Sequence, residues 1–115
     1  MIQVKRIYEQ PAKSDGRRVL VERLWPRGMS KERAKLDLWL KDIAPSPHLR
    51  KWFAHDQKKW DEFRKRYWAD LEQVPEVVDQ LRQMVKQGAL TLVYVARDEQ
   101  HNSAVILKAF LERSA

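Results

Sequence analysis

The chain has 115 residues, a length that accommodates one folded domain, residues 1–115, and excludes a second one of ordinary size. Hydrophobic residues make up 43% and charged residues 34%, a globular composition that excludes low-complexity and disordered chains. Because the chain has no cysteine, disulfides, thiolate metal sites and a cysteine nucleophile are excluded, and we expect a reducing, cytoplasmic location. No apolar stretch has the length of a membrane span or of a signal peptide, so we expect no membrane insertion.

The net charge of +7 is distributed unevenly along the chain. Residues 1–68 contain 18 basic and 9 acidic side chains, whereas residues 69–115 contain 5 basic and 7 acidic ones. A basic excess confined to one part of a sequence favours an anionic partner, either a nucleic acid or a nucleotide or phosphate metabolite. Charge alone does not decide between such a partner and a basic surface without one.

The first quarter of the chain has the pattern of two strands. Apolar and polar residues alternate over 2–8, which predicts a half-buried strand, and proline, serine, aspartate and glycine over 9–17 predict a loop. A continuous apolar run predicts that residues 18–24 form a central strand covered on both faces. Residues 25–28, Trp-Pro-Arg-Gly, end that strand, because proline cannot donate to a sheet and glycine permits a turn.

The middle of the chain is predicted to be mostly helical. A serine caps a short helical turn over 30–35, and the alternation over 36–40 predicts a third strand. A Ser-Pro pair starts a helix over 46–55. Asp56 can cap a further helix, whose buried stripe at spacings of three and four residues comprises Trp60, Phe63, Tyr67 and Leu71.

The last forty residues follow the order helix, strand, helix. Pro75 opens a helix that ends at Gly88, and residues 90–96 form the clearest strand of the sequence. Asp98 can cap a final helix, whose core face comprises Ala104, Leu107 and Leu111. Strands that alternate with amphipathic helices predict an α/β sandwich, a mostly parallel sheet with helices packed on it. The large helical share leaves an α+β arrangement open.

Two segments follow predicted strands and carry side chains that can bind an anion. The first is residues 23–28, with Arg23 and Arg27, and the second is residues 97–102, with Arg97. Ligands of open α/β sheets bind beyond the carboxyl ends of the strands, so these segments meet there if their strands are parallel neighbours. We therefore predict a pocket in which the three arginines clamp an oxyanion.

Two side chains of the second segment can carry acid and base chemistry. His101 can donate or transfer a proton, and Asp98 can orient a base. The alternative interpretation needs no ligand: Arg97 and Asp98 form a local ion pair, Asp98 only caps a helix, and Trp25 with Pro26 fills a corner of the core. The residues alone leave both interpretations open.

Residues 50–68 combine aromatic rings with seven basic and three acidic side chains. Such interleaving can hold a phosphate backbone and stack bases, as in a nucleic-acid-binding accessory protein. Most of these rings fall at helical spacing, which favours a buried stripe with a solvated basic face. Trp68 stands one position off that stripe and is the ring that best tests the alternative.

Other chemistries find little support in the sequence. The three histidines, at positions 48, 55 and 101, do not have ligand spacing within one element, which disfavours a metal site. No serine lies in a nucleophile-elbow sequence, and the chain contains neither a glycine-rich phosphate loop nor a dinucleotide fingerprint. We therefore predict no metal and no cofactor.

Several motifs resemble a known family in their order along the chain. They are Val19–Gly28, Ala44–Ser46, Leu49–Phe53, His55–Asp56, Trp60, Phe63, Arg66–Tyr67, Ala96–Asp98 and His101–Asn102. With these motifs the chain resembles the domain-of-unknown-function family 488 (DUF488), in its short YeaO-like branch, over residues 2–111. The resemblance implies a compact bacterial domain, a small three-layer Rossmann-like sandwich, and it implies no reaction.

The chain departs from the broader family in one region. That family has cysteines and a histidine-arginine pair where this chain has residues 96–102, with no cysteine and the pair His101-Asn102. Thiol and metal-thiolate chemistry are therefore not carried over. We predict an acid or base role for Asp98 and His101, and ligand binding by Arg23, Trp25, Arg27, Arg50, His55, Arg97 and Asn102.

The leading functional hypothesis is a small cytoplasmic protein that binds an anionic, phosphate-bearing ligand, a nucleotide or metabolite, at the carboxyl ends of its strands. The alternative is a nucleic-acid-binding accessory protein that uses the basic surface of residues 1–68. A third hypothesis is a subunit of a larger assembly, which an exposed apolar patch around Trp39 or Trp68 would favour. The sequence decides neither the reaction nor the oligomeric state.

Overall fold

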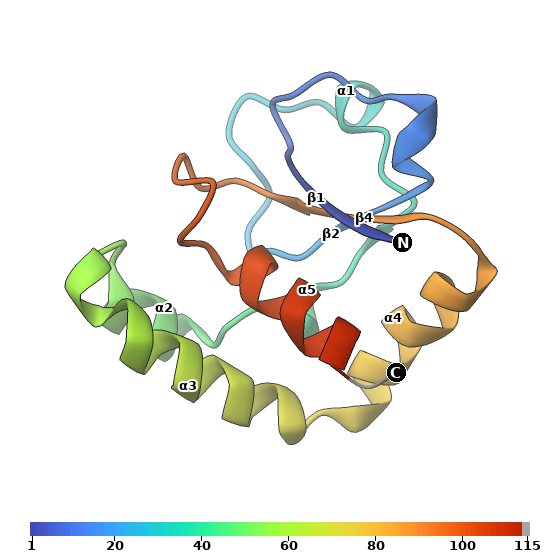
Figure 1. The fold of residues 1–115 in the computed structure, drawn as a ribbon. Helices are drawn as coiled ribbons and strands as arrows, with labels where there is room; N and C mark the ends of the chain where they lie inside the picture. Colours follow the sequence, from blue (N-terminus) through green and yellow to red (C-terminus); the bar gives the residue numbers. More distant parts are fainter. Residues whose placement is uncertain (114–115) are drawn as a thin grey trace.

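A computed structural model describes residues 1–113 of the protein (Figure 1). Its strands are β1 (Ile2–Arg6), β2 (Arg17–Leu20), β3 (Leu38–Trp39) and β4 (Leu90–Tyr94). Its helices are α1 (Lys31–Ala34), α2 (Pro47–Phe53), α3 (Trp60–Glu72), α4 (Pro75–Gln87) and α5 (Ser103–Arg113), with 3-10 turns at Lys13–Asp15, Lys41–Ile43 and Gln57–Lys59. Each predicted strand and helix is present. Among the described residues, no helix has the length and apolar content needed to cross a membrane.

The four strands form one parallel sheet in the order β1-β4-β2-β3. All five residues of β4 are buried, and its Leu92 lies between Val4 of β1 and Val19 of β2. The apolar runs in β2 and β4 therefore belong to central strands that are covered on both faces. The prediction of a mixed α/β fold with a parallel sheet and helices packed on it is confirmed.

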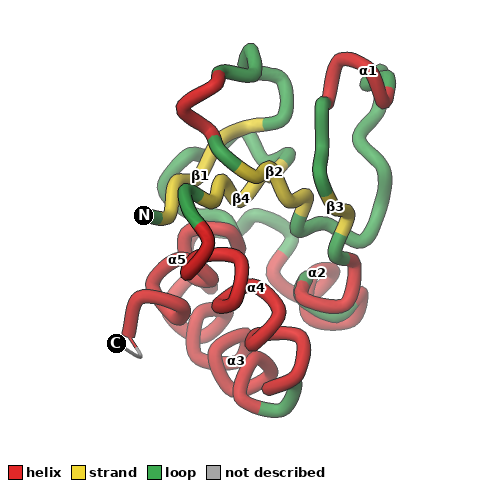
Figure 2. The backbone as a smooth tube through the Cα atoms, turned by 90° about the vertical axis from the view of Figure 1, so that its right-hand side faces the viewer, coloured by secondary structure: helices red, strands yellow, loops and turns green. Residues whose placement is uncertain are grey.

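The two faces of the sheet are covered differently (Figure 2). Helices α2, α3, α4 and α5 cover one face, where Val19 and Leu92 belong to the main core. On the other face, Leu20 and Val93 pack with Ala34 beneath loops and the single-turn helix α1. The sheet thus lies between a full helical layer and a thin layer built largely of loops.

The handedness of parallel connections explains this division. Such connections are right-handed, so the face that each covers depends on the direction in which the chain moves along the sheet. The connections from β1 to β2 and from β2 to β3 move toward the β3 edge, whereas the connection from β3 to β4 returns with α2, α3 and α4. The chain leaves β2 and β4 toward opposite faces, which opens a crevice between the carboxyl ends of these neighbours.

Helix α3 presents the predicted apolar stripe to the core. Phe63, Tyr67 and Leu71 are buried. The Phe63 ring stacks on Phe53 of α2 with ring centroids 4.2 Å apart, and the Tyr67 hydroxyl donates to the carbonyl of Ile43 at 2.7 Å. These contacts hold α2 and the turn at 41–43 against α3, which builds the helical wall beside the crevice.

The central strand β2 is shorter than its sequence pattern predicts. The strand expected over 18–24 ends at Leu20. The amide of Val21 makes the last backbone bond to β4, and the carboxylate of Glu22 then accepts the next β4-side amide, that of Val95, at 3.0 Å. A side chain therefore replaces a backbone partner at the end of this strand.

The first and third strands also differ from their expected boundaries. The strand predicted over 2–8 ends at Arg6, where the chain turns and the Glu9 amide donates to the Arg6 carbonyl at 3.1 Å. The strand predicted over 36–40 pairs with β2 at only two residues. Both strands lie at the edges of the sheet, where each is held by hydrogen bonds to only one neighbouring strand.

The loop between β1 and β2 encloses a buried ion pair. Asp15 accepts hydrogen bonds from the Arg18 guanidinium at 2.7 Å, from the amide of Ala12 at 3.0 Å and from the Lys5 ammonium at 3.0 Å. Arg18 also donates to the carbonyl of Ala34 at 2.8 Å. Burial acts to raise the pKa of Asp15, but these hydrogen bonds outweigh it and hold the pKa below its ordinary value. The network fastens this loop and the end of α1 to β2.

Candidate functional site

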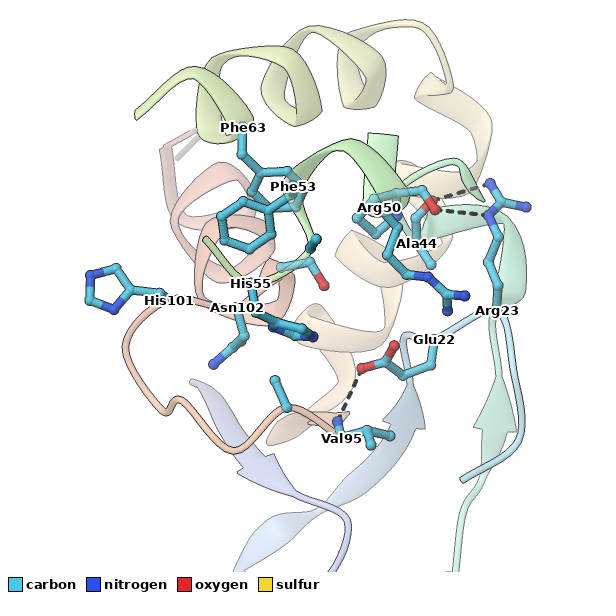
Figure 3. Close-up of a pocket in the computed structure, with 14 residues that line it drawn as sticks. Glu22, Arg23, Ala44, Arg50, Phe53, His55, Phe63, Val95, His101 and Asn102 are labelled. Atoms are coloured by element: carbon cyan, nitrogen blue, oxygen red, sulfur yellow. Dashed lines mark hydrogen bonds between the residues drawn. The ribbon is translucent and has the colours of Figure 1, made fainter. Parts of the chain in front are cut away.

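The crevice between β2 and β4 contains a pocket of about 420 Å³. Its walls come from the segments that follow β2 and β4, from α2 and α3, and from the start of α5 (Figure 3). The lining residues are Glu22, Arg23, Ala44, Pro45, Arg50, Phe53, Ala54, His55, Phe63, Val95, Ala96, His101, Asn102 and Ser103. The pocket lies where neighbouring parallel strands send their connections to opposite faces, the usual ligand position in open α/β sheets.

Glu22 supplies the acidic group among these lining residues. Its Oε2 atom accepts the Val95 amide, and its backbone carbonyl accepts the Trp39 indole N–H at 2.6 Å. Burial raises the pKa of Glu22, while the hydrogen bond from Val95 and the positive charge of Arg50 act in the opposite direction. Glu22 was not predicted as a site residue, because its place after an apolar run does not show whether its carboxylate faces solvent or a crevice.

The two arginines of the pocket have different roles. Arg23 donates from Nε to the carbonyl of Pro45 at 3.0 Å and from Nη2 to the carbonyl of Ala44 at 3.2 Å. It thereby ties the 44–45 segment to the end of β2. The Arg50 guanidinium makes no hydrogen bond or ion pair within residues 1–113 and extends toward the same space as Glu22 (Figure 3). Arg50 is thus the cation of the described pocket that a ligand can engage.

His55 enters the pocket from a strained segment after α2. Ala54 and His55 both have left-handed backbone conformations, with φ of 47° and 58°. Two successive non-glycine residues in this region are unusual and costly, and such strain is often found at functional sites. The conformation turns the His55 ring toward the pocket, with its centroid 6.0 Å from that of Phe53 (Figure 3).

Helix α5 begins at the pocket. Asn102 is buried, and its Oδ1 atom accepts the amide of Val105 at 3.1 Å, so Asn102 caps the helix. The prediction that Asp98 caps α5 is wrong, because Asp98 instead accepts the amides of Gln100 and His101 in the preceding turn. The start of α5 presents its unpaired amides and the positive end of its dipole on the pocket side.

Asp98 and His101 form a hydrogen-bonded pair at the rim. Asp98 Oδ2 lies 2.9 Å from His101 Nδ1 and accepts a hydrogen bond from the side-chain Nε2 of Gln57 at 3.1 Å, while Trp60 meets the His101 ring edge-on with centroids 5.1 Å apart. The hydrogen bond from the Gln100 amide, together with the hydrogen bonds and charge of His101, lowers the pKa of Asp98 to about 2. Asp98 therefore stays ionised near neutral pH and orients His101.

A second, more open pocket of about 660 Å³ adjoins the first. The two pockets share the residues His55, Val95 and Ala96. Arg97 and Asp98 line the second pocket together with Arg6, which donates to the carbonyl of Ala96 at 2.9 Å and lies over the Tyr8 ring at 4.9 Å. Arg97 thus belongs to a hollow next to the one that Arg23 and Arg50 line.

Trp25 and Arg27 lie outside the pocket. The Trp25 indole donates to the carbonyl of Met29 at 2.7 Å, and its ring meets Trp39 edge-on with centroids 5.4 Å apart on the loop-covered face. Arg27 is exposed, and its carbonyl accepts the Tyr8 hydroxyl at 2.9 Å. The structure therefore does not assemble the three-arginine clamp of Arg23, Arg27 and Arg97, because the turn at 25–28 folds over the other face.

The aromatic rings of residues 50–68 are engaged within the molecule. Trp52 carries the Arg66 guanidinium 4.4 Å and the Lys59 ammonium 5.2 Å from its ring centroid. Trp68 packs edge-on against Phe110, with centroids 4.8 Å apart. Both rings also contact the main core. These contacts agree with the interpretation of the segment as a core stripe with a basic outer face. Residues 1–113 contain no cluster of three or more groups that could hold a metal ion.

Together these features define a Rossmann-like α/β domain with a polar crevice at the carboxyl edge of a parallel sheet. The chain belongs to the DUF488 family, since residues 1–115 match the family model described as the "Inactive DUF488-N3 subclade". The resemblance found in the motifs is thereby confirmed.

Relatives with similar sequences are all described as uncharacterized. The protein YeaO of Escherichia coli (strain K12) is 42% identical over 110 residues, which cover 96% of both chains. Protein Rv3073c of Mycobacterium tuberculosis (strain ATCC 25618 / H37Rv) and protein Mb3100c of Mycobacterium bovis (strain ATCC BAA-935 / AF2122/97) are each 36% identical over 110 residues, which cover 96% of this chain and 92% of theirs. No solved structure matches the chain.

Proposed function

We propose that the pocket between β2 and β4 binds a small anionic, phosphate-bearing ligand. The observation that carries the proposal is the unpaired guanidinium of Arg50 in a pocket that also holds the start of α5. A guanidinium gives a phosphate two directed hydrogen bonds, and a helix N-terminus adds amide donors and a favourable dipole. The Arg50 guanidinium makes no hydrogen bond or ion pair within residues 1–113, so its donors are open to a ligand.

We further propose that the ligand is bound without being turned over, in the cytoplasm. The family model that matches the chain carries the word "Inactive" in its description. In addition, the Asp98 pKa of about 2 keeps this carboxylate ionised near neutral pH, so Asp98 itself does not exchange a proton there. The polar groups of the pocket then serve recognition.

A matched pair of variants on one helix tests the proposal. Arg50→Gln and Lys51→Gln each remove one positive charge from an exposed position of α2, but only residue 50 lines the pocket. We expect Arg50→Gln to weaken binding of inorganic phosphate, measured by calorimetry, by about tenfold or more. Lys51→Gln should change the dissociation constant by less than about twofold, because distant exposed charges are screened by salt.

Two results would overturn the proposed function. One is that the unmodified protein binds neither inorganic phosphate nor an alkyl phosphate at millimolar concentrations. The other is that both variants weaken phosphate binding equally, since the attraction would then come from the general positive charge of the surface. Circular dichroism of both variants checks that the fold is kept.

A further inference from the structure

Glu22 and Arg50 lie near each other in the pocket without pairing. Both line the pocket and point into it (Figure 3), yet they form no ion pair within residues 1–113. A carboxylate and a guanidinium that line one pocket of about 420 Å³ without pairing can both engage a ligand. Such a ligand is expected to present a different chemical group to each of them.

The carboxylate of Glu22 is fixed in position, and only one of its two oxygen atoms accepts a hydrogen bond within residues 1–113. The amide of Val21 bonds to the carbonyl of Val93 at 3.1 Å, and the carbonyl of Glu22 accepts the Trp39 indole, so the backbone is held on both sides. Oε2 accepts the Val95 amide. Within the part of the chain that the structure describes, Oε1 accepts no hydrogen bond. The sheet therefore presents a fixed acceptor to the pocket.

A fixed carboxylate discriminates among phosphate-bearing ligands. A ligand whose only polar group is the phosphate brings its negative charge toward Glu22, and the two charges repel each other. A ligand that also carries hydroxyl groups places an O–H donor between the charges. Hydrogen bonds to an ionised acceptor are about twice as strong as those between neutral groups. Glu22 therefore strengthens the binding of a hydroxylated phosphate ester and weakens the binding of one without hydroxyl groups.

We infer that Glu22 selects phosphate esters that carry hydroxyl groups, that is, phosphorylated polyols or sugars. The phosphate lies at Arg50 and the start of α5, and a ligand hydroxyl donates to Glu22 Oε1 at the end of β2. This assignment rests on the proposed anion site and adds the class of ligand that the site takes.

Two matched probes and one variant test the inference. Glycerol 3-phosphate and n-propyl phosphate share the same carbon chain and differ only in the two hydroxyl groups. We expect the unmodified protein to bind glycerol 3-phosphate about tenfold more tightly than n-propyl phosphate. In Glu22→Gln the amide oxygen can still accept the Val95 amide, so the side chain keeps its place while its charge is removed.

The variant has two expected signatures. The preference for glycerol 3-phosphate should fall to about threefold or less, because the ionised acceptor is gone. The affinity for n-propyl phosphate should rise, because a repulsive charge is gone, and an unfolded or damaged variant cannot produce such a rise. Together the two changes support a selective role for Glu22.

Other outcomes overturn the inference and separate it from the anion site. If n-propyl phosphate and glycerol 3-phosphate bind equally well to the unmodified protein, the hydroxyl assignment fails while the anion site stands. If 3-aminopropyl phosphate binds more tightly than glycerol 3-phosphate, Glu22 selects an amine and the hydroxyl assignment fails as well. If neither these esters nor inorganic phosphate binds, the proposed function fails and this inference falls with it.

Discussion

At the scale of single residues, charged side chains act as partners for backbone groups that the short strands leave unpaired. Glu22 accepts an amide beyond the end of β4, and Arg23 donates to two carbonyls of the 44–45 segment. Arg18 donates to the carbonyls of Ala34 and Lys35 at the end of α1. Buried backbone groups must be paired, and a sheet this small cannot pair those of its connecting loops. Part of the high charge content of this chain therefore has a structural use.

The clearest test of this role is the buried Asp15. In Asp15→Asn the Arg18 charge loses its counter-ion at a position that is 3% exposed, and the free energy of unfolding should fall by about 3 kcal/mol. The control Asp61→Asn removes one half of an exposed pair with Arg64 at 3.6 Å and should cost less than about 0.5 kcal/mol. Urea denaturation of both variants makes the comparison, and similar losses would show that burial does not matter here.

The same variant has a pH dependence with a defined sign. Because the folded protein lowers the pKa of Asp15, the native state binds this proton more weakly than the unfolded chain does. The stabilisation is therefore fully present above the ordinary carboxyl pKa of about 4 and is lost as the pH falls through the lower folded value. The difference in stability between the unmodified protein and Asp15→Asn should shrink steadily below about pH 4.

Residue types with their spacing predicted part of the candidate site. Arg23, His101 and Asn102 line one pocket, as expected from their places after strands, and so do Arg50 and His55, which were predicted from the family resemblance. Glu22 was missed because a charged residue at the end of an apolar run gives no sign of whether it points to solvent or into a crevice. The use of Arg23 as a backbone donor was equally hidden, since only the fold brings the 44–45 carbonyls to it.

At the scale of elements, the turn at 25–28 shows how a loop replaces a layer of helix. Met29 and Ala34 pack with Leu20 and Val93 on the face of the sheet that lacks long helices. Trp25 closes this second core through its contact with Trp39 and its bond to the Met29 carbonyl. The Trp-Pro-Arg-Gly motif therefore belongs to packing in this structure, as the interpretation without a ligand had it.

Substitutions of Trp25 separate packing from binding. Trp25→Ala should lower the free energy of unfolding by about 3 kcal/mol because a large half-buried ring is removed, and Trp25→Phe by about 1 kcal/mol because the indole N–H bond is lost. Neither change should alter the affinity of the folded protein for inorganic phosphate, since Trp25 does not line the pocket. A clear loss of phosphate binding in Trp25→Phe would show that Trp25 contributes to the binding site.

Elements were easier to predict than their ends and neighbours. The 3.6-residue stripe of α3 and the apolar runs of β2 and β4 appear as expected, because burial on one or both faces sets those patterns. The end of β2 was misplaced because Glu22 and Leu24 continue the strand pattern after the ladder has stopped. The capping role of Asn102 was assigned to Asp98, because both residue types cap helices and only the geometry distinguishes them.

At the scale of the whole molecule, strand order creates the site. Segments 22–23 and 95–103 are separated by about seventy residues of chain and meet because β2 pairs with β4. Sequence patterns carry no direct record of strand order, since each strand of a parallel sheet is compatible with several neighbours. The right-handed connection rule sends the chain to the loop-covered face after β2, whereas α5 follows β4 on the opposite face, and a crevice opens between the two strand ends.

The net charge of +7 also lets the basic surface bind polyanions non-specifically, and this binding must be distinguished from binding in the pocket. A single-stranded oligonucleotide should bind the basic surface without sequence preference, and its affinity should fall steeply between about 50 and 200 mM salt as counterions are released. Trp68→Phe should leave this affinity unchanged, because the Trp68 ring packs against Phe110 and does not stack on bases. Titrations of the unmodified protein and of Trp68→Phe with two unrelated sequences at both salt concentrations measure the sequence preference, the salt dependence and the effect of the substitution. A marked sequence preference or a loss of affinity in Trp68→Phe would instead favour a nucleic-acid-binding accessory protein, since base contacts and stacking would then add to the phosphate contacts.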